Sequence, residues 1–513
     1  MIGNRLSYRA DARQILNEAL SADAERICFR TDSDLIFSEV DSDAIESALT
    51  GGETQKFKFQ RMKDGRWSDV SGYTKVLDTT RLFNDLMRAD ASSVAKLPID
   101  ELAEAVGRAG DRFHLALKKI LRNLNDRLAA QPNSLVISRW RTYFAELEPL
   151  VQDDYLDYFL AALELLECAL DNGLFEIIAD SDRTKLKPLM QKLDNCASKY
   201  QSVPAQVSAL NQFGKIYSLI DRSAAADCFR LMKEKDQDNL VPYFYSDMGS
   251  QTYYSQRDIL DSEAEDRTNT ICGSLRWLSP EKPGDSEFGI LISVDSNFFR
   301  IYAWLIYFYA QQLPSVDFNV LICGDQAEAE QLISDGDRFV EGLNTLNRSG
   351  IPTNINFLRI PVPDFVVQPK TFYASARFYA ARPLLDVYPR LYLMDADLMF
   401  TEDPTRFFER IKDIPFAAPE NLGLTYLSPW RRYLAGNIPL NRSILGTDFM
   451  NDLLNYTSHG LSAQQSWMLD QNAITYAVEL NFPDTSVSLN SFNRPLFPPK
   501  FRSTWEQNFF TRQ

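Results

Sequence analysis

Two aspartates separated by one residue follow an apolar, strand-like segment of the chain. The segment 390–394 reads RLYLM, and Asp395, Ala396 and Asp397 come directly after it. Residues i and i+2 of an extended chain point the same way, so both carboxylates can converge on one cation. Two carboxylates provide part of the octahedral oxygen shell of Mg²⁺ or Mn²⁺, which phosphate oxygens and water typically complete. The alternative is a solvated turn at the end of a strand.

Alternating strands and helices place this pair of acids at the edge of a predicted sheet. Short apolar segments alternate with helical segments from residue 288 onward, which predicts a mainly parallel sheet covered by helices on both faces. We expect its strands at 288–294, 317–323, 354–360 and 390–394. Ligands of such sheets bind beyond the carboxyl ends of the strands, where Asp295 also lies because it follows the first strand directly.

The chain before the sheet divides into two further predicted parts. Residues 1–80 form a small mixed segment, in which KFKFQRMKDGRWSDV predicts a β-hairpin that turns at its Asp-Gly. Residues 81–278 carry apolar residues three and four apart, which predicts helices. Within them, 209–239 resembles one tetratricopeptide repeat, and an ordinary helix pair is the alternative. The Pro- and Gly-rich SPEKPGDSEF predicts the boundary to a third domain, residues 279–513.

Composition and charge argue against several classes of function. The chain has 513 residues, of which 45% are hydrophobic and 24% charged, as in ordinary globular proteins. Its formal net charge of −16 argues against nucleic-acid binding and against a polybasic membrane anchor. The N-terminal stretch lacks the apolar core of a secretory signal, and the apolar stretch at 301–310 is too short to span a bilayer. We therefore predict no transmembrane segment.

Cysteine and histidine usage narrows the chemistry further. The six cysteines lie far apart without any C-x-x-C pair, which argues against a zinc site or a disulfide framework. Reduced thiols fit a cytoplasmic protein, and we predict that location. Only two histidines occur, which disfavours mechanisms that need a histidine base or several histidine ligands.

Four segments resemble one enzyme family, in the same order, over residues 286–480. ISVDSNFFRIYAWLIYF resembles its opening strand and helix, and YASARFYAARPLLDVYPRLYLMDADLMFTEDP resembles its phosphate-binding helix and D-x-D strand. YLAGNIPLNRSILGTDFMNDLL resembles its acceptor-side strand, and SWMLDQNAITYAVE its helix with an Asp-Gln pair. The family is glycosyltransferase family 8, the glycogenin and bacterial galactosyltransferase group. The resemblance implies its GT-A fold, a Rossmann-like α/β domain behind the mostly helical N-terminal region.

The resemblance also implies metal- and phosphate-binding residues. Asp395 and Asp397 would hold Mn²⁺ or Mg²⁺ against the diphosphate of a nucleotide sugar. Arg377 would lie on the preceding helix, where its planar fork suits a phosphate or the D-x-D carboxylates. The alternative for Arg377 is a surface charge on an amphipathic helix.

Four further residues receive roles from the same resemblance. Asp295 and Asn297 would contact the base and ribose, and their alternative is a helix cap after a strand. Asp470 and Gln471 would lie beside the reacting sugar carbon, where they orient hydroxyl groups and stabilise an oxocarbenium-like state. Their alternative is a plain polar face in the middle of a helix.

Two departures from the family concern the metal and the acceptor side. The family's third metal ligand is a histidine near the C-terminus, but residues 481–513 contain none. Asn490, Asn493 and Lys500 are the candidate substitutes there, and we predict Asn490, because an amide oxygen is an acceptable ligand of Mg²⁺ or Mn²⁺. In the family's N-x-G motif, Leu434 occupies the asparagine position here, and Asn437 follows the glycine.

Three functions compete at this level. The first is an enzyme that moves a hexose, with retention of configuration, from a UDP-linked donor to a saccharide, lipid-linked or protein acceptor. The second is a non-enzymatic helical-repeat adaptor that carries a degenerate transferase domain. A nucleotidyltransferase is disfavoured, because SVDSNFFR lacks the glycine-rich loop that holds a triphosphate. In either favoured case, the helical region would position an acceptor or a protein partner.

Overall fold

The structure is a computed structural model of the chain, and two compact units are distinguished in it. One comprises Met1–Leu121 and Arg139–Leu156, and the other Arg122–Ser138 and Asp157–Gln513. The residues that the structure describes are 26–30, 35–39, 59–63, 66–69, 82–89, 94, 97–107, 113–121, 124, 134–179, 183–236, 245–260, 263–279, 286–347, 352–399, 409, 413–418, 427–482 and 502–503.

The first unit contains a small antiparallel sheet and helices. Its strands pair in chain order: β1 (Arg26–Arg30), β2 (Leu35–Glu39), β3 (Phe59–Lys63) and β4 (Arg66–Asp69). The predicted hairpin is confirmed, because β3 and β4 pair antiparallel with Met62 opposite Trp67. Helix α4 (Ile99–Val106) belongs to the same unit, whose aromatic core includes Phe113 and Phe144 with ring centroids 6.4 Å apart.

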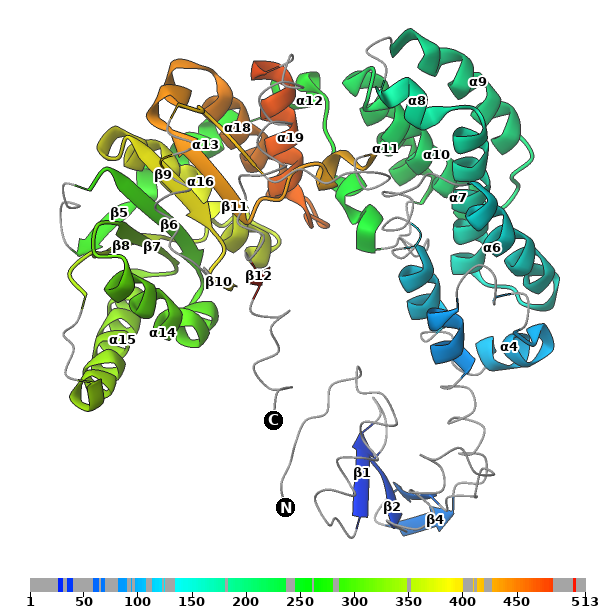
Figure 1. The fold of residues 1–513 in the computed structure, drawn as a ribbon, viewed down its shortest axis with the longest axis horizontal. Helices are drawn as coiled ribbons and strands as arrows, with labels where there is room; N and C mark the ends of the chain where they lie inside the picture. Colours follow the sequence, from blue (N-terminus) through cyan, green and yellow to red (C-terminus); the bar gives the residue numbers. More distant parts are fainter. Residues whose placement is uncertain are drawn as a thin grey trace. The chain divides into compact units, whose positions relative to one another are not determined.

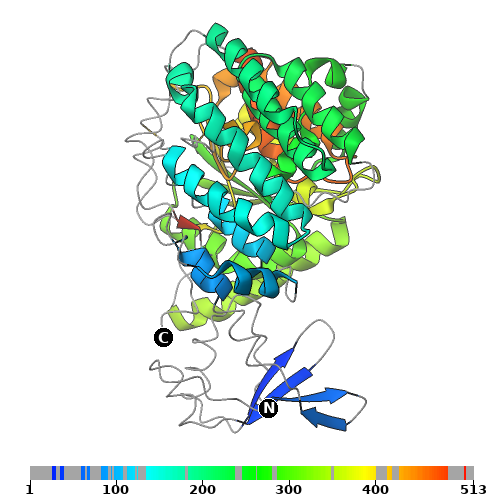
Figure 2. The same cartoon turned by 90° about the vertical axis from the view of Figure 1, so that its right-hand side faces the viewer.

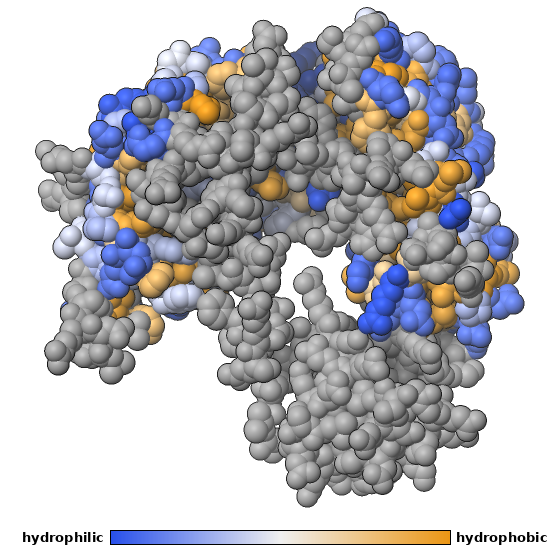
Figure 3. All heavy atoms as spheres, in the orientation of Figure 1, coloured by the Kyte–Doolittle hydropathy of each residue, from blue (hydrophilic) through white to orange (hydrophobic). Residues whose placement is uncertain are grey.

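Residues 134–274 are mainly helical, as predicted. The helices are α6 (Ser134–Leu147), α7 (Asp154–Asp171), α8 (Leu174–Ala179), α9 (Leu186–Ala197), α10 (Val203–Tyr217), α11 (Arg222–Lys235), α12 (Gln256–Leu260) and α13 (Ala264–Ser274), with 3₁₀ turns η2 (Glu148–Leu150), η3 (Arg183–Lys185) and η4 (Tyr245–Thr252). Figures 1 and 2 show α7 to α11 side by side. Hydrophilic residues dominate their outer rim in Figure 3. Among the described residues, no helix has the length and apolar character needed to cross a bilayer.

Helices α10 and α11 form a closely packed hairpin. The Ser202 side chain caps α10 by accepting from Ala205 N, and Asp221 caps α11 by accepting from Ser223 N and Ala224 N. Gly214 of α10 lets the two helices approach, because a Cβ there would lie 2.5 Å from the Phe229 ring of α11. A helix pair at this place is therefore confirmed.

A six-stranded mixed sheet forms the C-terminal part of the second unit. Its strand order is β11-β9-β6-β7-β8-β5. The strands β6 (Phe288–Val294), β7 (Asp317–Cys323), β8 (Ile355–Ile360) and β9 (Arg390–Met394) are parallel, as predicted, whereas the edge strands β5 (Arg276–Ser279) and β11 (Asn437–Asn441) are antiparallel to their neighbours. A short separate pair joins β10 (Leu398–Met399) and β12 (Arg502–Ser503).

Helices cover both faces of this sheet (Figure 1). On one face, Ile290 and Ile292 pack with residues of α14 (Ser296–Gln312) and α15 (Gln326–Asn347). On the other face, Leu291 packs with residues of α16 (Pro369–Val387), α18 (Phe449–Gly460) and α19 (Leu469–Asn481). The alternation follows from the two-residue period of a strand. The remaining turns are η6 (Pro429–Arg431) and η7 (Arg442–Gly446).

The structure places the start of the sheet region earlier than the predicted boundary at 278/279. That boundary falls inside β5, which pairs with β8 of the same sheet. Ile259 of α12 and Ile271 of α13 also belong to the core under the sheet. The Pro- and Gly-rich segment therefore connects two strands of one sheet, and its composition did not indicate a domain boundary.

Gly249 of η4 offers a direct test of the packing in the second unit. A Cβ at this position would lie 2.1 Å from Cγ of the fully buried Trp430. We expect Gly249→Ala to lower the free energy of unfolding by about 1–3 kcal/mol, as overpacking commonly does.

The matched control is Gly273→Ala in α13, where an added Cβ meets nothing within 4 Å. Because alanine favours helices over glycine, we expect a change between zero and a gain of about 1 kcal/mol. Urea unfolding of both variants checks the pair, and equal effects would contradict this packing.

Candidate functional site

The acids that follow β6 and β9 lie at the same edge of the sheet. The two strands are parallel neighbours, with Ile292 opposite Met394. Asp395 follows β9 directly, whereas Ala396 and Asp397 lie in a turn in which Leu398 N donates to Asp395 O at 3.2 Å. The extended backbone that the sequence predicted for Asp395 to Asp397 is therefore not observed. Adjacent strands lie about 4.8 Å apart, so the predicted convergence of strand ends at one edge is confirmed.

Arg377 connects three separate elements at this edge. Its guanidinium, on α16, forms an ion pair with Asp395 after β9, and Nη2 lies 3.8 Å from Asp470 Oδ2 on α19. Arg377 is only 2% exposed, which excludes the alternative of a surface charge. Its Nε is buried and has no hydrogen-bond partner among the described residues. The structure thus brings two predicted acids of the site, Asp395 and Asp470, together around the buried Arg377.

Two carboxyl groups of the site have raised pKa values. Burial, and next the negative charge of Asp395, raise the pKa of Asp397 to about 6, although the positive charge of Arg377 opposes the rise. Burial also raises the pKa of Asp470, an effect that Arg377 opposes and Asp395 reinforces. Neighbouring groups therefore only partly offset the cost of a negative charge on Asp397 and on Asp470.

The main chain just before β11 leaves little space around Asp395. The backbone N–H of Asp395 donates to Gly436 O at 3.0 Å, and a Cβ on Gly436 would lie 2.1 Å from Asp395 Oδ2. The glycine of LAGN, for which the sequence alone predicted no role, therefore makes room for this carboxylate. Asn437 accepts a hydrogen bond from the Tyr392 hydroxyl, so it joins β11 to β9.

Asp470 and Gln471 lie in the first turn of α19. Met468, just before the helix, is left-handed with φ 63°, and no other non-glycine among the described residues has a positive φ. Such conformations persist only where the surroundings enforce them. In the orientation that satisfies its amide, Gln471 Nε2 donates to Trp430 O and Tyr433 O, each at 3.0 Å. Gln471 therefore fixes the loop before β11 against α19.

The predicted nucleotide-binding residues have a structural role of their own. Asp295 caps α14 by accepting from Phe298 N at 2.7 Å, which is the alternative considered from the sequence. Asn297 is exposed. Among the described contacts, none joins Asp295 to Arg377, Asp395 or Asp470. A role of Asp295 and Asn297 toward a nucleoside stays a prediction.

The donor set fits a hard divalent cation in part. Asp395 and Asp397 offer carboxylate oxygens, which such cations prefer, and a cation beside them would lower their raised pKa values. In the part of the chain that the structure describes, no group of three or more His, Cys, Asp or Glu could hold a metal. The predicted third ligand, Asn490, lies outside the described residues.

Comparisons with known proteins identify no relative. No family model matches the chain, and no curated protein is significantly similar to it. The assignment of a function therefore depends on the residues and their geometry.

The raised pKa of Asp397 predicts that this residue destabilises the metal-free protein at neutral pH. A carboxyl group with a folded-state pKa of about 6 stabilises the fold below its unfolded pKa, and that contribution is lost as pH rises through 6. We expect Asp397→Asn to raise the melting temperature at pH 7 but not at pH 4.

The control is Asp386→Asn, at the exposed C-terminal end of α16 and thus at the other edge of the sheet. It should leave the melting temperature nearly unchanged at both pH values. A destabilising effect of Asp397→Asn at pH 7 would contradict the like-charge repulsion.

Proposed function

We propose that the protein is a metal-dependent glycosyltransferase with a GT-A fold. It would transfer a hexose, with retention of configuration, from a UDP-linked donor to a saccharide, lipid-linked or protein acceptor. The observation that carries the proposal is the buried Arg377, which binds Asp395 and approaches Asp470 at the carboxyl edge of a parallel sheet. Strained or incompletely compensated charges at such an edge are typical of ligand sites.

The order of the strands supports the same proposal. The D-x-D strand β9 lies between β6, the opening strand, and β11, which resembles the family's acceptor-side strand. Because β11 follows β9 in the chain and pairs with it, Gly436 lies directly beside Asp395. Donor and acceptor would thus meet over neighbouring strand ends.

Each residue at this edge of the sheet would have a different role. Asp395 and Asp397 would hold Mn²⁺ or Mg²⁺, which when bound neutralises charge that develops on the leaving nucleotide. Arg377 would orient Asp395, and its buried Nε–H, which has no hydrogen-bond partner among the described residues, would donate to a phosphate oxygen. Asp470, held near Arg377, would accept hydrogen bonds from sugar hydroxyls. Gln471 would act indirectly, by holding the loop 430–433.

A screen for metal-dependent hydrolysis of nucleotide sugars tests this function. We expect the wild type to release UDP in the presence of Mn²⁺, and Asp397→Ala to reduce the rate at least about a hundredfold, as loss of a key electrostatic group does. Asp386→Ala, at the opposite edge of the sheet, should retain the wild-type rate. Equal rates for both variants would contradict the proposed role of Asp397.

One observation favours the second candidate, an adaptor with a degenerate transferase domain. The Arg377 guanidinium already neutralises Asp395, which a catalytic metal would also need. Calorimetry with UDP and Mn²⁺ separates the two functions. The transferase should bind UDP with a metal-dependent heat that Asp397→Ala removes, whereas the adaptor should give no such heat.

A further inference from the structure

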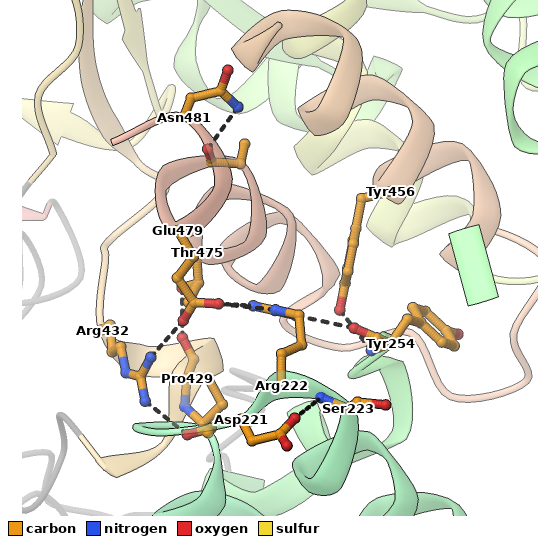
Figure 4. Close-up of polar contacts among 12 residues, drawn as sticks. Asp221, Arg222, Ser223, Tyr254, Pro429, Arg432, Tyr456, Thr475, Glu479 and Asn481 are labelled. Carbon is orange, nitrogen blue, oxygen red and sulfur yellow. Dashed lines mark hydrogen bonds and ion pairs between the residues drawn. The ribbon is translucent and has the colours of Figure 1, made fainter. Parts of the chain in front are cut away.

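A single arginine of the helical hairpin reaches α19, the helix that carries Asp470. Arg222, the first residue of α11, donates through Nε and Nη2 to Glu479 Oε2 at 2.9 and 2.6 Å (Figure 4). Its Nη1 donates to Tyr254 O at 3.0 Å. The guanidinium also lies over the rings of Tyr253 and Tyr476, 4.5 and 5.1 Å from their centroids. Each nitrogen of this guanidinium thus donates a hydrogen bond.

A second arginine binds the same carboxylate from the other side (Figure 4). Arg432 Nη1 donates to Glu479 Oε1 at 2.7 Å, and its Nη2 donates to Ser218 Oγ, just after α10, at 2.7 Å. Each oxygen of Glu479 therefore has its own arginine. Charge-assisted hydrogen bonds of this kind fix orientation more tightly than neutral ones.

Further contacts hold α19 along its length. Asn472 Nδ2 donates to Gly249 O of η4 at 2.7 Å, and Thr475 Oγ1 donates to Pro429 O at 2.7 Å. The Trp430 ring packs against Phe229 of α11 with centroids 5.4 Å apart. The loop that Gln471 binds is therefore held between α11 and α19.

We propose that Arg222 and Glu479 are positioning residues of the candidate site. Glu479 follows Asp470 by nine positions along α19, which corresponds to about 13.5 Å of helix. Because a helix is stiff over this length, the hydrogen bonds that hold Glu479 also fix the position of Asp470 relative to Arg377. The α10–α11 hairpin then supports the site through α19, and it is not an independent module that only binds an acceptor. The catalytic consequence rests on the proposed function, but the mechanical coupling does not.

Hydrogen exchange measures the coupling without any substrate. We expect backbone amides of α19 to exchange about tenfold faster, or more, in Arg222→Gln and in Glu479→Gln, because local opening becomes easier. The matched control is Arg230→Gln, on the same α11. Among the described contacts, the exposed Arg230 pairs within its own helix, with Asp227 and Glu234 at 3.0 and 2.7 Å.

Three results of this measurement decide the coupling. Faster exchange of α19 in both variants, with the control like wild type, supports it. Unchanged exchange of α19, or an equal change in the control, overturns it. If Arg222→Gln does not fold, Arg222→Lys keeps the charge but not the fork, and it should give a smaller acceleration confined to α19.

Kinetics then test the consequence for the site. With a hydrolysed nucleotide sugar, we expect Arg222→Gln to lower kcat about tenfold and to change the Kd of UDP less than about twofold, because the nucleotide contacts lie on the sheet. The rate is normalised to the number of UDP-binding sites, so a loss of folded protein alone does not change the measured kcat. An unchanged kcat in Arg222→Gln would overturn the positioning role. If the wild type hydrolyses no nucleotide sugar, the proposed function fails while hydrogen exchange still decides the coupling.

Discussion

The burial of one guanidinium constrains the whole sheet edge. Arg377 cannot remain buried without anionic partners, since an unpaired internal charge costs several kcal/mol. Its partners come from two other elements, the end of β9 and the start of α19. The relative positions of α16, β9 and α19 are therefore linked through one cation. Any ligand that binds beside Asp395 or Asp470 must share or replace these interactions.

Helix α19 belongs to two environments at once. Its first turn faces the sheet edge through Asp470, and its last turn faces the α10–α11 hairpin through Glu479. Its other side packs into the core under the sheet. The helices from Asp157 onward and the sheet belong to one compact unit, and α19 is one of the elements that join them. A change in the hairpin can thus reach the site without touching it.

Local sequence patterns predicted the elements well wherever one face of each element is buried. The four parallel strands lie within one residue of their expected bounds. A short, continuous apolar run between helical segments is typical of a parallel strand that is buried on both faces. The hairpin β3–β4 and the pair α10–α11 follow equally local signals. The predicted boundary at 278/279 falls inside β5, because proline and glycine indicate a break in local structure, which occurs inside a sheet as readily as between domains.

The sequence by itself determined the secondary structure and the delivery of acids to the carboxyl edge, since both depend on neighbours a few residues apart. Only the tertiary structure decided which charges meet. Arg222 and Glu479 are 257 residues apart, and no periodicity relates them. The use of Asp295 as a helix cap and of Gln471 as a loop anchor also depends on backbone groups brought near by folding. Hydrogen bonds and ion pairs act over a few ångströms in space, whatever the separation along the chain.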